Sequence, residues 1–323
     1  MIQDSTTKKR RVVFLGTPAI VVPVLEQLLE ENDLFSVVAV VSQPPTRAVR
    51  GNSTVPSPVH ARALQAGIQV LTPESAKDAR FIEQLAALDP ELCVTAAYGQ
   101  VLSEEFLAIP KFGTLNIHPS LLPLYRGAAP VQRALQDGVT ETGVTIAQTV
   151  RAMDAGPIVA QIHYKIDEAV KAQELLSRLF ALGAHELVHI LPNYFSGACQ
   201  LMTQDHERAT KARKMSVEEG LLSPMREPAR VMHNKVRAFA GWPGTRLVVV
   251  NGEDSFEVKV LTTKVSPQIK AYNNEILQVA DRLELVCGDG SVLEIHELQA
   301  PGKRVMTARD FWNGLKIKSL RWV

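Results

Sequence analysis

Short apolar runs alternate with helical patterns over the first two hundred residues, and this alternation is the feature that most constrains the fold. Runs rich in valine, isoleucine and leucine lie at 11–16, 37–41, 69–71, 92–97 and 114–117. Segments with apolar residues at helical spacing lie at 20–31, 57–66, 81–88 and 129–137. Strands separated by helices are typical of a parallel sheet, because parallel strands need a crossover connection. We therefore predict an α/β fold with a doubly wound, mostly parallel sheet.

The rest of the chain has a different pattern. Residues 144–150 and 158–166 predict a further strand pair, and residues 171–195 predict a long closing helix. Residues 197–215 are polar and lack periodicity, which predicts a linker. A helix is predicted at 227–240, followed by five β-rich runs with glycine-containing turns. These runs lie at 245–250, 256–265, 275–279, 283–287 and 292–298. Such short, closely spaced strands favour a small β-barrel.

Length and composition agree with a two-domain globular protein. The chain has 323 residues, of which 46% are hydrophobic and 21% charged, and this excludes wholesale disorder. The predicted organisation is a basic tail at 1–10, an α/β domain at 11–196, a linker at 197–215 and a C-terminal β domain at 216–323. No stretch approaches the roughly 18 uninterrupted apolar residues that a membrane helix needs, so no membrane partner is predicted.

The cysteines argue against a disulfide-rich or zinc-binding protein, and the charge distribution indicates a charged partner. Cys93, Cys199 and Cys287 lie far apart, which argues against a disulfide framework and a structural zinc site, so we predict no metal. Residues 1–204 carry 16 basic and 19 acidic side chains, whereas residues 205–323 carry 19 and 15. This asymmetry indicates a polyanionic partner for the C-terminal part.

The segment at 113–132 holds the densest group of residues suited to chemistry. Asn116 and His118 follow an apolar strand, and their spacing of two residues on extended backbone points both side chains the same way. Pro119 and Pro123 stiffen the loop that follows, so a ligand could meet a preformed surface. Polar residues at the carboxyl end of a parallel strand lie where ligands bind in open α/β sheets.

Asp154 is the third candidate. It lies in the turn Met153-Asp154-Ala155-Gly156-Pro157 between two apolar strands, where a carboxylate can cap its own backbone or pair with His118. Asparagine, histidine and aspartate without a serine or cysteine nucleophile suit the transfer of an activated acyl group to an amine. Asn116 would donate to the carbonyl oxygen, His118 would stabilise the oxyanion or move a proton, and Asp154 would hold His118.

Residues 113–132, including Asn116, His118 and 120–123, resemble the signature of the folate-dependent formyltransferases. Further segments resemble the members of that family that act on methionyl-tRNA, in order over nearly the whole chain. They are 13–18, 43–59, 96–100, 154–157, 234–244 and 301–303.

The resemblance implies a formyltransferase domain followed by an OB-like, tRNA-binding β-barrel. It implies a formyl transfer from 10-formyltetrahydrofolate, as co-substrate, to the free amino group of initiator methionyl-tRNA for translation initiation. It also implies catalytic roles for Asn116, His118 and Asp154. The residues implied to line the folate site are Ser120, Leu121, Leu122, Pro123, Tyr98 and Gly99. The residues implied to contact tRNA, in the loop at 43–56, are Arg47 and Arg50.

The loop at 43–56 departs from the family pattern. Pro45 stands where the family usually has an acidic residue, and Asn52 and Ser53 stand where lysines are common. Contacts to phosphate are electrostatic, so fewer lysines predict a weaker hold on tRNA at this loop, or contacts placed elsewhere.

Two other functions fit parts of the pattern. A formyltransferase could act on a small amine, such as an amino-sugar nucleotide, but such a substrate would not need a basic C-terminal barrel. A non-enzymatic folate or RNA binder would not need a proton-handling pair such as His118 and Asp154. We expect a monomer. Location is expected to be the cytoplasm for a bacterial-type enzyme, or the mitochondrion or plastid for a eukaryotic one, since the N-terminal eleven residues hold no secretory signal.

Overall fold

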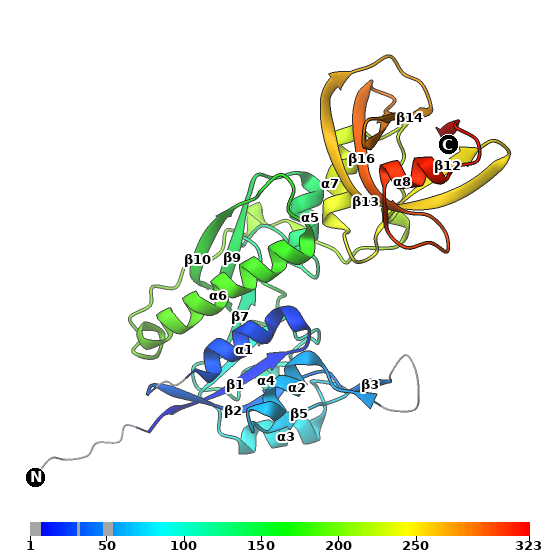
Figure 1. Cartoon of the computed structure of the whole chain (residues 1–323). Coiled ribbons are helices and arrows are strands. Elements are labelled where there is room, and N and C mark those ends of the chain that lie inside the picture. The colour runs from blue at the N-terminus through cyan, green and yellow to red at the C-terminus, as the bar shows by residue number, and fades with distance from the viewer. Residues whose placement is uncertain (1–7, 31–32, 48–53) are drawn as a thin grey trace, which may run out of the picture. The chain divides into compact units, whose positions relative to one another are not determined.

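The computed structural model describes residues 8–30, 33–47 and 54–323. Its first sheet has seven strands in the order β10-β9-β7-β6-β1-β2-β5 (Figure 1). The strands are β1 Arg10–Gly16, β2 Phe35–Val41, β5 Val70–Leu71, β6 Leu92–Ala96, β7 Thr114–His118, β9 Glu141–Gln148 and β10 Ile158–Lys165. Strands β5, β2, β1, β6 and β7 run parallel to one another, and β9 is antiparallel to β7. The predicted α/β fold with a mostly parallel sheet is confirmed.

Helices cover this sheet because its strands are apolar on both faces. In β1, Val13 and Leu15 pack with Phe81 and Leu85 of α3, whereas Phe14 lies on the other face. Figure 1 shows α1 and α3 on opposite sides of the strands. The helices of this part are η1 Ala19–Val21, α1 Val22–Leu29, α2 Pro58–Gln65, α3 Ala79–Ala87, α4 Glu104–Leu107 and α6 Ala172–Phe195.

Glycine allows α6 to approach the sheet closely. A Cβ at Gly183 would lie 2.5 Å from Cγ2 of Ile117 in β7 and 2.9 Å from Cγ2 of Val144 in β9. Any side chain here would push the helix away from the strand that carries Asn116 and His118. The shape of the sheet behind the candidate residues therefore depends on this close contact.

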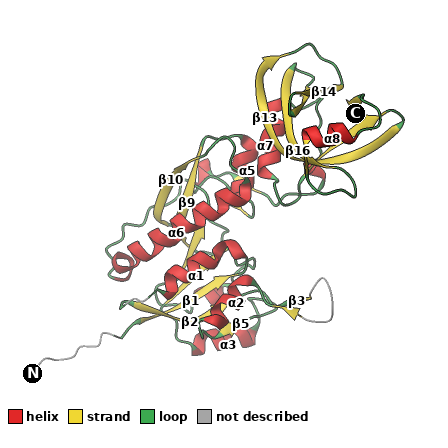
Figure 2. Cartoon of the chain, in the orientation of Figure 1, coloured by secondary structure: helices red, strands yellow, loops and turns green. Residues whose placement is uncertain are grey.

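The second sheet closes on itself. Six antiparallel strands follow the order β13-β12-β18-β14-β15-β16, and β16 also pairs with β13. They are β12 Thr245–Asn251, β13 Asp254–Ile269, β14 Glu275–Val279, β15 Arg282–Val286, β16 Ser291–Gln299 and β18 Leu320–Trp322, with β17 Met306–Thr307 beside β16. The core of the barrel includes Leu247, Leu285 and Trp322, and Met232 of α7 packs into it. Figure 2 shows the strands of this barrel with α8 beside them. The predicted small barrel is confirmed.

Several short elements were not predicted. The barrel needs β18 to close the ring between β12 and β14, but its three residues follow a lysine-containing segment and carry no recognisable pattern. Helix α4 was also missed.

The remaining elements, whether predicted or not, complete the two units. They are β3 Thr46–Arg47, β4 Thr54–Val55, β8 Arg126–Gly127, α5 Pro130–Asp137, η2 His206–Arg208, β11 Lys211–Ala212, η3 Glu218–Gly220, α7 Ala229–Ala238 and α8 Ala308–Gly314.

The chain divides into two compact units, each assembled from separate stretches. The first unit takes 1–127, 142–164 and 176–211, and the second takes 128–141, 165–175 and 212–323. The domain boundaries drawn from the sequence stay predictions. Within the described residues, none of the helices combines the length and the hydrophobicity that a bilayer crossing requires.

Candidate active site

Strand β7 places Asn116 and His118 on one face at the carboxyl end of the parallel strands. Asn116 pairs with Thr95 of β6 and Ala147 of β9, so its backbone position is fixed from both sides. Its side chain is partly exposed, and no described group forms a hydrogen bond with its amide. An amide held on a central strand with its donors unused can donate to a substrate oxygen.

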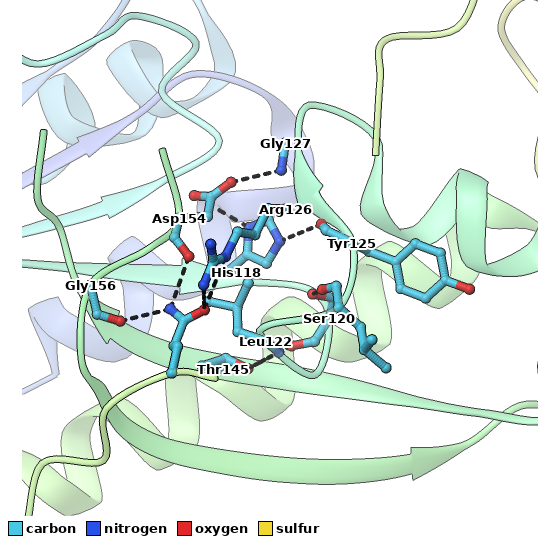
Figure 3. A network of polar contacts seen from close by, with 11 residues as sticks. His118, Ser120, Leu122, Tyr125, Arg126, Gly127, Thr145, Asp154 and Gly156 are labelled. Carbon is cyan, nitrogen blue, oxygen red and sulfur yellow. Dashed lines mark hydrogen bonds and ion pairs between the residues drawn. The ribbon is translucent and has the colours of Figure 1, made fainter. Parts of the chain in front are cut away.

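The imidazole of His118 is buried and held at both nitrogens (Figure 3). Nε2 lies 3.0 Å from the carbonyl oxygen of Tyr125, and Nδ1 lies 3.8 Å from Oδ1 of Asp154. A carbonyl oxygen can only accept, so Nε2 carries the proton of this bond. In the neutral ring, Nδ1 then holds a lone pair that faces Asp154. The nitrogen that can gain and lose a proton during a reaction is therefore Nδ1.

Asp154 reaches this position through its backbone conformation and a second contact. Its φ is +52°, a left-handed conformation that aspartate tolerates better than most residues. Its Oδ2 accepts a hydrogen bond from the backbone N–H of Gly127 at 2.8 Å, which leaves Oδ1 facing His118. The distance of 3.8 Å from Nδ1 to Oδ1 is longer than a hydrogen bond, and the two groups form an ion pair when the imidazole is protonated.

The loop after β7 is rigid because its polar groups bond within the protein. The hydroxyl of Thr145 donates to the carbonyl of Ser120 at 2.6 Å and accepts from the N–H of Leu122 at 3.1 Å. The side chain of Gln161 donates to the carbonyl of Leu122 at 2.7 Å. The side chains of Ser120 and Leu122 are buried, while Leu121 and Pro123 are half-buried. Among the predicted folate residues of this loop, Leu121 and Pro123 have the side chains that a ligand could contact.

Tyr98 and Gly99 follow β6, at the same edge of the sheet. The ring of Tyr98 is buried in the core beside Phe81 and Phe106, and burial raises the pKa of its hydroxyl to about 12. Its carbonyl accepts from Thr17 at 2.9 Å and from the side chain of Gln43 at 3.2 Å. Gly99 is exposed with φ of +90°. A ligand at this loop would therefore meet its backbone rather than the tyrosine ring.

The two arginines predicted to contact tRNA are placed differently. Arg47 is exposed in the short strand β3, which pairs with β4 in a hairpin. Arg50 lies outside the described residues. No contact joins Arg47 to His118 or Asp154 among the residues that the structure describes. The structure thus places His118 beside Asp154, with Asn116 two residues earlier on the same strand and the 120–123 loop just after it, and places Arg47 on a separate hairpin.

Three polar residues that sequence analysis missed also shape the site. They are Thr145, Gln204 and Thr210, all bonded to the loops that hold His118 and Asp154. Gln204 and Thr210 lie in the segment predicted to be a linker, and a polar stretch without periodicity gave no signal of this. Within the described ranges no cluster of three histidine, cysteine or acidic side chains is placed to hold a metal ion.

Comparison with known proteins identifies the family. Residues 10–191 match the sequence model of the formyl transferase family, and residues 214–316 match that of the formyl transferase C-terminal domain. A methionyl-tRNA formyltransferase of Roseiflexus castenholzii is 39% identical over 95% of this chain and 96% of its own length. One from Listeria welshimeri is 37% identical over 94% of this chain and 95% of its own length.

Solved structures share the fold at low sequence identity. WlaRD, a sugar 3N-formyl transferase, superposes with a TM-score of 0.65 at 16% identity, covering 91% of this chain and 99% of its own. HypX from Aquifex aeolicus, solved in complex with tetrahydrofolic acid, gives a TM-score of 0.60 at 15% identity, covering 94% of this chain and 47% of its own. With both domains matched in order over most of its length, the chain belongs to the formyl transferase family.

Proposed function

We propose that this chain transfers the formyl group of 10-formyltetrahydrofolate to the free amino group of initiator methionyl-tRNA. The names of the relatives that match over almost the whole chain support the acceptor. The observation that carries the chemistry is the buried His118, with Nδ1 facing Asp154 at the end of the strand that also presents Asn116. This set of groups handles a proton and an oxyanion and offers no side-chain nucleophile.

The reaction needs a proton removed from the amine, a proton delivered to N10 of the folate, and one stabilised oxygen. The amino nitrogen attacks the formyl carbon, the carbonyl oxygen gains negative charge, and the bond from that carbon to N10 of the folate breaks. One proton leaves the amine and one reaches N10. Asn116 is placed to donate to the oxygen, and Nδ1 of His118 is placed to take the proton. The carboxylate of Asp154 stabilises the charged imidazole that results.

The loops around the site fit a flat ligand that is rich in hydrogen-bonding groups. The loop at 97–100 offers backbone groups beside an exposed glycine, and its Tyr98 carbonyl is fixed by Thr17 and Gln43. Leu121 and Pro123 offer apolar contact from a loop that Thr145 holds. A pterin ring has two flat faces and a polar edge. The apolar side chains can contact a face, and the backbone groups can bond to the edge.

The C-terminal unit offers exposed basic side chains to the tRNA. A cavity of about 1000 Å³ opens on the barrel, lined by Phe256, Met306 and Phe311, with the basic Lys303 and Arg304 and the acidic Glu297 and Asp310 among the other lining residues. Both basic side chains are exposed. Together with the excess of basic residues at 205–323, this surface fits a nucleic-acid backbone bound by charge.

Removing these two charges should weaken tRNA binding. We expect the double variant Lys303→Ala/Arg304→Ala to lower the slope of log Kd against log salt by about 1 to 2, because each lost phosphate contact removes about one unit. The measurement is Kd for methionyl-tRNA at several salt concentrations. Lys77→Ala, an exposed lysine of the first unit, is the matched control and should leave the slope unchanged. Equal slopes in the double variant and the parent would remove this surface from tRNA binding.

The hairpin with Arg47 should contribute to the binding of the acceptor tRNA and not to the binding of folate. We expect Arg47→Ala and Arg50→Ala each to raise KM for methionyl-tRNA by about tenfold, the value of roughly one charge-assisted contact. The KM for 10-formyltetrahydrofolate should stay within error of the parent value, and this comparison is the internal control. A rise in the KM for folate with an unchanged KM for tRNA would show that the arginines bind folate, and would contradict the prediction.

Two predictions from the sequence stay predictions. One is the monomeric state. The other is the compartment, either the bacterial cytoplasm or a mitochondrion or plastid. The first seven residues, which belong to the predicted basic tail, lie outside the described residues.

A further inference from the structure

The segment between the two matched regions is part of the active site. It lies within residues 192–213, after the first match ends at 191 and before the second begins at 214. Its backbone pairs with the strand that follows the Asp154 turn, since Met202 and Ile158 exchange hydrogen bonds of 2.8 and 2.9 Å. From the contacts of this segment we infer that Gln204 is a positioning residue that holds the carboxylate of Asp154 toward His118.

Gln204 bonds to both loops of the site with both ends of its amide. Its Nε2 donates to the carbonyl of Asp154 at 2.9 Å and to the carbonyl of Gly156 at 2.7 Å. Its Oε1 accepts from Nε and Nη2 of Arg126 at 3.1 and 2.6 Å. The side chain is buried, the bond to Gly156 is fully buried, and the other three bonds are partly buried. A buried amide with every bond made fixes its partners, since losing one partner leaves a polar group unpaired.

These bonds complete a closed ring around the carboxylate. Arg126 is covalently followed by Gly127, whose N–H donates to Oδ2 of Asp154 at 2.8 Å. The ring closes where the carbonyl of Asp154 accepts a hydrogen bond from the side chain of Gln204. The residue before Arg126 is Tyr125, whose carbonyl meets Nε2 of His118. The ring therefore sets the position of Asp154 against the loop that orients the imidazole.

Thr210 holds the other side of the same loop. Its hydroxyl accepts from the N–H of Tyr125 at 2.8 Å, and its carbonyl accepts from the N–H of Arg126 at 2.9 Å. Its own N–H donates to the carbonyl of Pro123 at 3.3 Å. The segment thus contacts the loop after β7 and the Asp154 turn at once. Within this segment, the side chain of Gln204 bonds to both.

The Asp154 turn has little freedom to adjust without this support. Asp154 is in a left-handed conformation, and a Cβ at Gly156 would lie only 1.9 Å from the carbonyl oxygen of Gln148. A turn packed this closely moves as a unit rather than by small local shifts. When Gln204 no longer holds its two carbonyls, we expect the carboxylate to turn away from Nδ1, and a misplacement of about 1 Å can cost about 10²-fold in rate.

The inference rests on the proposed function for its kinetic readout. We expect Gln204→Met, which keeps the length of the side chain and loses all four bonds, to lower kcat for formyl transfer by about 10- to 100-fold. The KM values for both substrates should change by less than about threefold, because a positioning role acts on the transition state. Thr203→Ala, an exposed neighbour in the same segment, is the control and should match the parent.

The variant Gln204→Glu separates the bonds that Gln204 accepts from Arg126 from the bonds that it donates to the Asp154 turn. A carboxylate can still accept from Arg126, but it cannot donate to the carbonyls of Asp154 and Gly156. We expect this variant to lose kcat as Gln204→Met does. Activity of Gln204→Glu equal to the parent would overturn the inference, and so would a kcat of Gln204→Met within twofold of the parent.

A second readout is independent of activity. Hydrogen exchange of the Gly127 amide, followed by NMR on the full chain, reports its bond to Asp154. We expect faster exchange at Gly127 in Gln204→Met and an unchanged rate in Thr203→Ala. If the parent chain does not formylate methionyl-tRNA, the proposed function fails, while this exchange still decides the positioning role. An unchanged Gly127 rate in Gln204→Met would overturn that role.

Discussion

His118→Ala is expected to lower kcat for formyl transfer by about 10²- to 10⁴-fold, the usual share of a group that moves a proton in the transition state. The variant removes the nitrogen that faces Asp154 and leaves Asn116 in place. Because His118 acts on a proton that moves only during the reaction, both substrates should bind with nearly unchanged KM. Steady-state kinetics with both substrates saturating measure the loss.

The control is His185→Ala, which removes an exposed histidine of α6. It should keep the parental rate, and both variants should unfold at temperatures close to that of the parent. Full turnover by His118→Ala, with tRNA and folate saturating, would contradict the assignment of the proton transfer to this residue.

Asp154→Asn is expected to lower kcat by about 10²-fold through its effect on His118. The asparagine oxygen can still accept from Gly127, so the turn should keep its shape, but the negative charge that faces Nδ1 is lost. Adding Asp154→Asn to His118→Ala should lower kcat little further, because the carboxylate has no imidazole left to act on. Kinetics of the two single variants and the double variant measure this coupling.

Independent, multiplying losses in the double variant would contradict the coupling. In that case Asp154 would act on the substrate directly or serve only to shape its turn. The Gly127 bond offers a check on the second option, because an asparagine that disturbs the turn would also change the exchange of that amide.

The longer strands of the first sheet could be predicted because each is a nearly continuous apolar run, whereas their order in the sheet was not predicted. In β7 the same run ends at Asn116 and His118, and the two-residue period of extended backbone places both on one face without any tertiary information. The five longer barrel strands could be predicted for a similar reason, since turns at Gly252, Asn273-Asn274 and Gly288-Asp289-Gly290 separate most of them. The three residues of β18 are too few to show a period, so the closure of the barrel could not be predicted.

The contacts of Gln204 could not be predicted, because its partners at 126 and 154 are 78 and 50 residues away in the chain. No local pattern marks a glutamine that is buried in a polar segment. The roles of Ser120 and Leu122 were equally hidden, since a motif identifies residues without telling which side chains point inward. Both cases depend on tertiary packing, which sets the burial of a loop residue.

The most direct test of the account is the acceptor that the full chain formylates. With 10-formyltetrahydrofolate as donor, we expect formyl transfer to initiator methionyl-tRNA, with a KM for the tRNA that rises steeply as salt is added. An amino-sugar nucleotide offered under the same conditions should receive no formyl group. Formylation of the amino-sugar nucleotide, with no formyl-methionyl-tRNA formed at any salt concentration, would contradict the account.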